Sequence, residues 1–433
     1  MRPIYLDHNA TTPVLPEVWD AVRAAQPGNP ASAHAAGRAA RRALEDARER
    51  VAALLGAHAD EVTFTSGATE ANNLALLGSA LVVRPTPPAP LPEGRGEKEQ
   101  DVSLRSTRAQ PSESNNSHGS PNSGSPLPSG RGARGVGRTT DADNQPALFV
   151  ASQIEHPCVL EPLRHLERRG ARVEWLPADA RGVIAWRAPA EPVFACVMLA
   201  NHENGALQPV REIAASLPKG SRVHCDAVQA VGKMPVNFRD LGATTLSASA
   251  HKFGGPKGIG VLLLKRGATL SPLAFGGHQQ KGLRPGTEPV PLAMGMATAL
   301  EVAARDLSAT RAKLESLRER LWLGLQRTCG PVVLNGPEIG APDALPTTLN
   351  VSFLGCRADL LLMALDLAGV SCSTGSACSS GSLLPSPVLR AMGVPDDVLR
   401  SALRFSLSAA QSVEEVEEAV GRIAECAQRV RKG

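Results

Sequence analysis

The chain has 433 residues, enough for two domains, and 46 lysines and arginines against 42 aspartates and glutamates give it a net charge of only +4, which argues against nucleic-acid binding. No apolar run reaches the ~18 residues of a membrane span, and the N-terminal residues lack the apolar core of a signal peptide. The eight cysteines contain no CxxC pair, so neither a zinc site nor a disulfide framework is indicated, and a reducing cytoplasmic compartment is expected.

The first predicted elements are a helix and a strand that leads into a polar turn. Apolar residues recur at three- and four-residue steps from about residue 36 to 55, which is typical of an amphipathic helix. A short strand is predicted at 61–65, and the turn 66–70 links it to an apolar helix. Free main-chain N–H groups and the helix dipole favour a phosphate at such a turn, and the hydroxyl of Thr69 adds a donor. The alternative is an ordinary helix N-cap.

Residues 84–146 differ in composition from the rest of the chain. They contain no aromatic residue and are crowded with proline, serine and glycine. Because such a segment cannot bury enough apolar surface to offset its ordering entropy, we predict a disordered insertion between a helix and a strand. It is either a neutral surface insertion or a segment that docks a partner.

Four further strands are predicted between residues 147 and 229, and helical patterns alternate with them. The run at 193–199 is continuously apolar, as in a strand buried on both faces of a parallel sheet. This alternation predicts an α/β domain, in which ligands gather beyond the carboxyl ends of the strands. The candidate site residues at such ends are Thr69, His156, Asn201, Asp226 and Lys252.

Lys252 lies in a turn of small residues and glycines between two strand-like runs. Partial desolvation there lowers a lysine's pKa and frees its amine to form a Schiff base. Pyridoxal phosphate needs such a lysine, an acid beside its pyridinium nitrogen, a phosphate cradle and a stacking surface. Lys252, Asp226, the turn 66–69 and His156 offer these four, and Gln229 could donate to the phenolic oxygen. Each also has a structural alternative: a solvated lysine, a helix N-cap or a loop histidine.

The last third of the chain is predicted to start with a long helical stretch, from about residue 292 through 325. A smaller mixed domain follows, with a loop of small polar residues at 371–382. Cys378 in this loop has no apolar neighbours, which predicts an exposed thiol able to act as a nucleophile. Cys372, at the start of the same loop, is the alternative. Arg404 begins a strand-like stretch.

Six motifs, in order along the chain, resemble those of the cysteine desulfurases, which belong to the class V aminotransferase branch of fold type I pyridoxal-phosphate enzymes. The resemblance covers the chain except for about residues 84–146. The Cys378 loop is similar to the short loop of the group that includes the NifS and IscS enzymes. The motifs are Leu6-Asp7-His8-Asn9-Ala10-Thr11-Thr12-Pro13, Thr65-Ser66-Gly67-Ala68-Thr69-Glu70, Ile154-Glu155-His156, Asp226-Ala227-Val228-Gln229, Ser249-Ala250-His251-Lys252 and Ser376-Ala377-Cys378-Ser379-Ser380.

This resemblance implies an α/β fold of two domains. A large domain, residues 15–305, would bind pyridoxal 5′-phosphate on a mostly parallel seven-stranded sheet between helices. A smaller α+β domain, residues 306–433, would carry the catalytic cysteine loop, and the N-terminal segment 1–14 would join it.

The resemblance also implies roles for matching residues. Lys252 would bind the cofactor covalently, His156 would stack on the ring and relay protons, and Cys378 would attack the substrate's sulfur. Asp226 and Gln229 would set the ring's electronics. The phosphate would be held by Ala68, Thr69, Ser249 and His251, with Thr287 reaching the cofactor of the neighbouring subunit in a homodimer. Asn201 would lie beside the ring, and Arg404, together with Asn201, would hold the substrate carboxylate.

The implied reaction removes sulfur from L-cysteine and gives L-alanine and a persulfide on Cys378. The partners implied are iron–sulfur scaffold or other sulfur-acceptor proteins, for cluster assembly or thiolation. Cys378 is also a candidate transient ligand of an iron–sulfur cluster. Gln280 stands where the family usually has glutamate, a difference away from the chemistry.

Two other functions remain open from the sequence. One is another enzyme of the same fold: an aminotransferase, a selenocysteine lyase or a cysteine-sulfinate lyase. These enzymes need no cysteine in a mobile loop, so Cys378 separates them from a desulfurase. The other is a sulfur carrier or scaffold without turnover, against which Lys252 and Asp226 argue.

Overall fold

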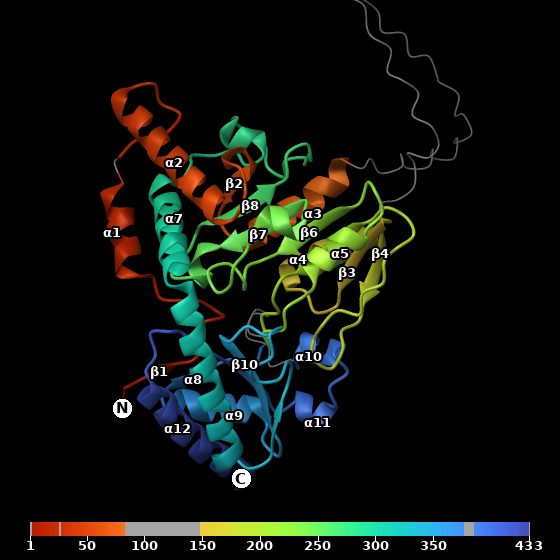
Figure 1. Cartoon of the computed structure of the whole chain (residues 1–433), viewed down its shortest axis with the longest axis vertical. Coiled ribbons are helices and arrows are strands. Elements are labelled where there is room, and N and C mark those ends of the chain that lie inside the picture. The colour runs from red at the N-terminus through yellow and green to blue at the C-terminus, as the bar shows by residue number, and fades with distance from the viewer. Residues whose placement is uncertain (1, 26, 83–147, 376–384, 433) are drawn as a thin grey trace, which may run out of the picture. The chain divides into compact units, whose positions relative to one another are not determined.

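A seven-stranded sheet forms the centre of the fold (Figure 1). The computed structural model describes residues 2–25, 27–82, 148–375 and 385–432. Only β8 runs antiparallel to its two neighbours, and all other adjacent strands are parallel. In spatial order the strands are β2 (Val62–Thr65), β8 (Gly260–Leu264), β7 (Thr245–Ser249), β6 (Arg222–Asp226), β5 (Phe194–Met198), β3 (Leu148–Ser152) and β4 (Arg172–Leu176).

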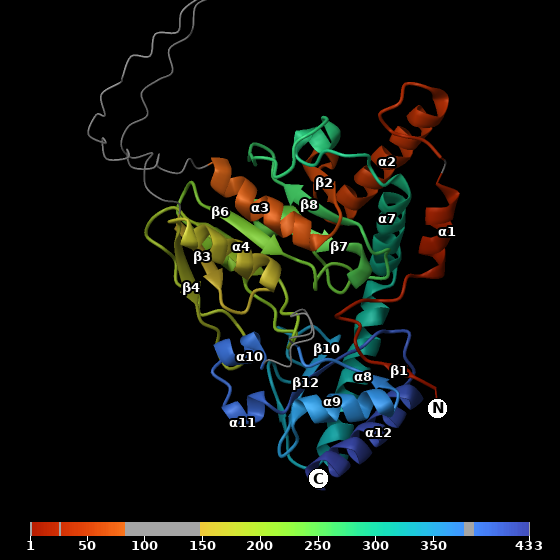
Figure 2. The ribbon, with the colours of Figure 1, turned by 180° about the vertical axis from the view of Figure 1, so that it is seen from behind.

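Helices cover both faces of this sheet, which is why its central strands are apolar throughout. In β5, Ala195 and Val197 pack into the core on one face, and Phe194 and Cys196 pack into the core on the other. Figure 2 shows α3 (Ala68–Val82) and α4 (Pro157–Arg168) on one face. The opposite face is covered by α2 (Ala35–Leu54), α5 (Val210–Ser216) and α7 (Val290–Arg305). The remaining helices of this part are α1 (Pro16–Ala24), α6 (Phe238–Leu241), η1 (Ala59–Glu61), η3 (Ala250–Lys252) and η4 (Gln279–Gly282).

A second, smaller core lies in the C-terminal part of the chain. An antiparallel sheet of β12 (Ala402–Ser406), β10 (Thr348–Phe353) and β9 (Val332–Leu334) packs there with helices, and Ile4 and Leu6 of the N-terminal segment join the same core. Strand β1 (Ile4–Tyr5) pairs in parallel with β11 (Val370–Ser371). The helices are α8 (Leu307–Thr328), α9 (Ala358–Leu367), α10 (Pro387–Ala391), α11 (Asp396–Leu399) and α12 (Val413–Lys432).

The α/β architecture and the mostly parallel seven-stranded sheet are confirmed. The helical stretch predicted for 292–325 is confirmed, and it consists of two helices that meet at Asp306. The backbone of this residue is not helical, at φ −106° and ψ 11°. The two helices belong to different hydrophobic cores: α7 packs on α2 in the core of the seven-stranded sheet, and α8 packs on α12 in the C-terminal core. The domain boundaries at 14/15 and 305/306 stay predictions.

The predicted disordered insertion at 84–146 lies outside the described residues, as does Cys378 with residues 376–384 of its loop. Across the described ranges, no helix is long and apolar enough to cross a membrane. The same ranges contain no cluster of three His, Cys, Asp or Glu side chains that could hold a metal ion.

Candidate functional site

One pocket, of about 710 Å³, contains most of the predicted site residues. It lies beyond the carboxyl ends of parallel strands, where Asp226 ends β6 and Ser249 ends β7. The predicted residues that line it are Ala68, Thr69, His156, Asp226, Gln229, Ser249, His251 and Lys252. The sequence separates these residues by up to 184 positions, and the sheet brings them together.

One end of the pocket is the turn before helix α3, where residues 66–69 line the wall. Close approach of this turn to the sheet depends on Gly260, because a Cβ there would lie 2.8 Å from the main chain of Gly67. Glu70 accepts from the main-chain N–H of Ser66 at 2.6 Å and from Arg284 at 3.0 Å. The N-terminus of α3 therefore lies at the pocket wall, where the first main-chain amides of a helix favour an anion.

Asp226 is held rigidly at another wall. Its carboxylate accepts from Asn72 at 2.8 Å and from the main-chain N–H of Val228 at 3.0 Å. The carbonyl of Asn72 lies 2.9 Å from Nε2 of His224, which fixes the amide with its nitrogen toward Asp226. Burial lowers the pKa of His224 to about 4, so the ring is neutral and can donate this proton. Sequence reasoning missed Asn72 and His224, which no motif marks.

His156 caps helix α4 and presents its ring to the pocket. Its Nδ1 accepts the main-chain N–H of Cys158 at 3.2 Å, so a neutral His156 carries its proton on Nε2. Burial lowers the pKa of His156, while the nearby Asp226 raises it and Lys252 lowers it. The ring of His202, a pocket residue that the sequence did not suggest, meets His156 edge-on with centroids 5.3 Å apart.

The amine of Lys252 is held by the N-terminal segment. Its Nζ donates to the main-chain oxygens of Asn9 at 2.6 Å and Ala10 at 3.0 Å. Gln229 donates to the same Asn9 oxygen at 3.1 Å. His251, beside Lys252, has a pKa lowered to about 4 by burial and by neighbouring lysines, so it is neutral in the pocket.

Two predicted substrate-binding residues, Asn201 and Arg404, are buried and are not among the residues that line the pocket. Asn201 accepts from the main-chain N–H groups of Glu203 and Asn204, and it donates to the oxygen of Ile154. These bonds shape its own loop. Arg404 donates to Asp7 at 2.7 Å and to the main-chain oxygen of His202 at 3.2 Å. Its Nε is buried without a hydrogen-bond partner in the described part of the chain.

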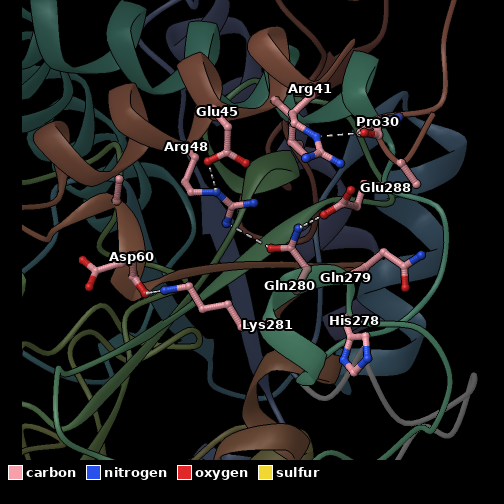
Figure 3. A pocket seen from close by; sticks show the side chains of 13 residues that line it. Pro30, Arg41, Glu45, Arg48, Asp60, His278, Gln279, Gln280, Lys281 and Glu288 are labelled. Atoms are coloured by element: carbon pink, nitrogen blue, oxygen red, sulfur yellow. Dashed lines mark hydrogen bonds and ion pairs between the residues drawn. The ribbon is translucent and has the colours of Figure 1, made fainter. Parts of the chain in front are cut away.

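Thr287 is exposed and outside this pocket, which leaves it able to face another molecule. The next residue, Glu288, lines a second pocket of about 670 Å³ (Figure 3). There Gln280 donates to Glu288, and its amide oxygen accepts from Arg48 at 3.1 Å and from the main-chain N–H of Phe64 at 2.9 Å. The figure shows Gln280 between the side chains of Arg48 and Glu288. This pocket contains none of the predicted cofactor or substrate residues.

Two buried carboxyl groups near the site have raised pKa values. Burial raises the pKa of Glu155 to about 8, with a smaller contribution from Asp226. Its Oε1 accepts from Ser152 at 2.8 Å and from the main-chain N–H of Met198 at 2.9 Å. Burial raises the pKa of Glu203 to about 7, and Ser386 donates to this carboxylate. Among the thiols, burial raises the pKa of Cys372, which makes it a poor nucleophile.

The pocket fits pyridoxal phosphate. It offers an amine for the aldehyde, a fixed carboxylate for the ring nitrogen, an aromatic side chain and helix amides for the phosphate. These groups are Lys252, Asp226, His156 and the start of α3. The volume is also within the range of small-molecule sites.

Comparison with known proteins gives consistent matches. A sequence model of the family described as Aminotransferase class-V matches residues 4–86 and 135–419. An IscS-like cysteine desulfurase of Mycobacterium tuberculosis is 37% identical over 414 residues, which cover 93% of this chain and 91% of that protein. The cysteine desulfurase IscS of Dictyoglomus turgidum is 35% identical and covers 94% and 90%. The solved structure of a NifS-like protein matches with a TM-score of 0.77 and 31% identity, over 98% of both chains.

Proposed function

We propose the function of this chain from one premise: the chain belongs to the class-V aminotransferase family and, within it, to the cysteine desulfurases. Members of this family depend on pyridoxal phosphate. The chain removes sulfur from L-cysteine and yields L-alanine and a persulfide. One observation carries this proposal: Lys252, Asp226, His156 and the start of α3 line a single pocket at the ends of parallel strands.

The residues divide the work of binding the cofactor. The N-terminal amides of α3, with Thr69, Ser249 and His251, receive the phosphate. Asp226 pairs with the ring nitrogen, and the Asn72 amide and the Val228 N–H keep its carboxylate in one orientation. When bound, pyridoxal phosphate supplies an electron sink that activates the bonds around the substrate's α-carbon.

His156 is suited to moving a proton within the pocket. Its lowered pKa keeps the ring neutral near pH 7, and its Nδ1 is occupied by the Cys158 N–H. The Nε2 proton is therefore the one exchanged, in a pocket that Lys252 and Asp226 also line. A neutral histidine in this pocket supports a role in general acid–base catalysis.

Cys378 receives the sulfur. Its thiolate attacks the substrate sulfur, the bond between that sulfur and the β-carbon breaks, and a proton replaces the sulfur on that carbon. Cysteine and one thiol thus become alanine and one persulfide, with no external oxidant or reductant. The support for Cys378 over Cys372 is its motif and the raised pKa of the half-buried Cys372 thiol.

Arg404 holds the substrate carboxylate, with Asn201 shaping the adjacent loop. The guanidinium is held by Asp7 and the oxygen of His202, and its buried Nε still lacks a partner among the described residues. A substrate carboxylate would satisfy that donor and share the charge with Asp7.

The finer parts of the proposal concern assembly. The chain acts in the cytoplasm as a homodimer in which the exposed Thr287 reaches the cofactor of the neighbouring subunit. It passes sulfur to iron–sulfur scaffold or other acceptor proteins, and Cys378 is a transient cluster ligand at most. Residues 1–14, 15–305 and 306–433 form the joining segment, the cofactor domain and the small domain.

Turnover of three substrates tests this function. Purified, cofactor-loaded protein is incubated in separate reactions with L-cysteine, L-selenocysteine and L-cysteine sulfinate, and alanine is measured. We expect alanine from L-cysteine, with loss of this product in Lys252→Ala. A protein that accepts only the selenium or sulfinate substrate, or that transfers amino groups without forming alanine, would contradict the proposal.

A further inference from the structure

A buried lysine outside the pocket contacts two residues of the site. Lys233, in the segment after β6, is only 8% exposed. Its Nζ donates to the side-chain oxygen of Gln229 at 2.6 Å and to that of Asn9 at 3.1 Å. Burial of an amine costs free energy unless the amine is hydrogen-bonded, so a buried lysine is expected to have a specific role.

The neighbouring hydrogen bonds fix which way the Gln229 amide faces. The main-chain oxygen of Asn9 can only accept, so the group 3.1 Å from it must be Nε2 of Gln229. Oε1 then faces Lys233. The Asn9 amide is fixed in the same way, because its Nδ2 donates to the main-chain oxygen of His202 at 3.2 Å and leaves Oδ1 for Lys233. Both acceptors therefore depend on one amine.

We propose that Lys233 is a positioning residue that keeps Gln229 a hydrogen-bond donor toward the cofactor pocket. Gln229 lines the pocket, and one of its two N–H bonds goes to Asn9. Within the described ranges no second acceptor contacts Gln229, so its other N–H is left for a ligand, which makes Gln229 a donor to the phenolic oxygen of the cofactor. Without Lys233, Oε1 would be buried unpartnered, and the amide could turn its oxygen toward the ligand. This inference rests on the proposed function.

Lys233 can donate to both Gln229 and Asn9 whether its amine is charged or neutral. Burial lowers its pKa well below the usual range, and the charges of Lys252 and Arg404 lower it further. Lys233 also contributes to lowering the pKa values of His8 and His251. Both pKa values are about 4, so these two histidines are neutral. A neutral amine still has two N–H bonds, enough for Gln229 and Asn9.

A double-mutant cycle tests the proposal. The variants are Lys233→Met, Gln229→Leu and both together, with the exposed Lys265→Met as control. The readout is the pKa of the lysine–cofactor linkage, titrated through its visible absorbance. A hydrogen bond donated to the phenolic oxygen makes that oxygen a weaker acceptor for the proton of the lysine–cofactor linkage. Loss of this donated hydrogen bond therefore raises the pKa of the linkage. We expect Lys233→Met to raise it by about one pH unit, the size of one hydrogen bond to a charged oxygen.

Lys233→Met should add no further shift when Gln229 is already leucine. An unchanged pKa in Lys233→Met, or the same shift with and without Gln229, would overturn the proposal. If Lys233→Met does not fold, the double variant should, since it removes the Gln229 amide that Lys233→Met leaves unpartnered. Failure of both to fold would assign Lys233 a structural role and also overturn it. If the wild type shows no such absorbance, the proposed function itself fails.

Discussion

Lys252 and Asn9, 243 positions apart in the sequence, are joined by a hydrogen bond of 2.6 Å from Nζ to the main-chain oxygen. The same Asn9 donates its side-chain amide to Thr348 in β10 at 2.8 Å. The N-terminal segment thus ties the amine of the cofactor site to the C-terminal core. The site is therefore built from both cores of the molecule.

Lys252→Ala should remove the cofactor's visible absorbance and lower cysteine turnover by about 10²-fold or more, the size of losing a positioned acid–base group. The reason is that Lys252 is the lysine we propose to bind the cofactor, and Lys257, the other described lysine that lines the pocket, lies five residues further along the chain. Absorbance spectra of the purified variant and alanine formation are the measurements. Lys265→Met, on the surface, is the control. A borohydride-reducible cofactor adduct that persists in Lys252→Ala would show that another lysine carries it.

Asn72→Leu should weaken cofactor binding without disturbing the fold around β6. The amide of Asn72 fixes Asp226, and its loss leaves that carboxylate and His224 without a shared partner. Removal of one partner of a buried hydrogen bond costs about 1–3 kcal/mol, or roughly a five- to 150-fold weaker dissociation constant. Equilibrium dialysis of the cofactor measures it. Asn73→Leu is the matched control, because the half-buried Asn73 lies on the same helix and donates to the main-chain oxygen of Thr69 instead of Asp226. Equal affinities in the two variants would refute the role.

Gln280→Glu should destabilise the protein at pH 8 by about 1–3 kcal/mol. It replaces the amide that donates to Glu288 with a second carboxylate, and two such groups repel when both are ionised. Denaturant unfolding measures the effect, which should shrink toward pH 5 as one carboxyl takes a proton. The double variant Gln280→Glu with Glu288→Gln restores an acid–amide pair and should recover stability. No recovery would mean that Arg48 and the Phe64 N–H, and not Glu288, determine residue 280.

Glu155 should make stability fall as pH rises. Its folded pKa of about 8 lies above the ordinary value of a free glutamate, so the folded state binds the proton more tightly than the unfolded state. The contribution of Glu155 to the free energy of unfolding is complete below the pKa that this residue has in the unfolded chain. It is lost between that pH and about 8, with a slope of at most about 1.4 kcal/mol per pH unit. Glu155→Gln should flatten this slope in unfolding experiments, and the exposed Glu174→Gln should not. Parallel curves for wild type and Glu155→Gln would contradict the assignment.

The sequence predicted the elements whose signals are local. The apolar run of β5 and the polar turn before α3 were recognisable because each pattern spans only a few residues. The strand ends also marked Asp226 and Lys252, since ligands of α/β sheets collect there.

Asn72, Asn9 and Lys233 could not be found in this way. Their roles come from hydrogen bonds to residues far away in the chain, as between Asn72 and Asp226, and no periodicity records such pairs. The break at Asp306 was also missed, because neither glycine nor proline marks it and the helical pattern continues on both sides. It arises where the chain changes from one core to the other.

Cys378→Ser should keep the cofactor and lower sulfur release by about 10³-fold or more, as expected for loss of a nucleophile. Cys372→Ser is the matched control, since burial raises the pKa of that thiol and keeps it protonated. Sulfide and alanine are measured with excess cysteine. Full activity in Cys378→Ser, or loss of activity in Cys372→Ser, would show that the wrong thiol was assigned.

The most direct test of the central claim is the mass of the peptide that contains Cys378 after a single turnover. The cofactor-loaded protein is mixed with one equivalent of L-cysteine in the absence of reductant, digested and analysed by mass spectrometry, and alanine is measured in parallel. We predict one added sulfur atom on Cys378 and an equal amount of alanine. Alanine without sulfur on Cys378, or sulfur on another cysteine in its place, would contradict the mechanism.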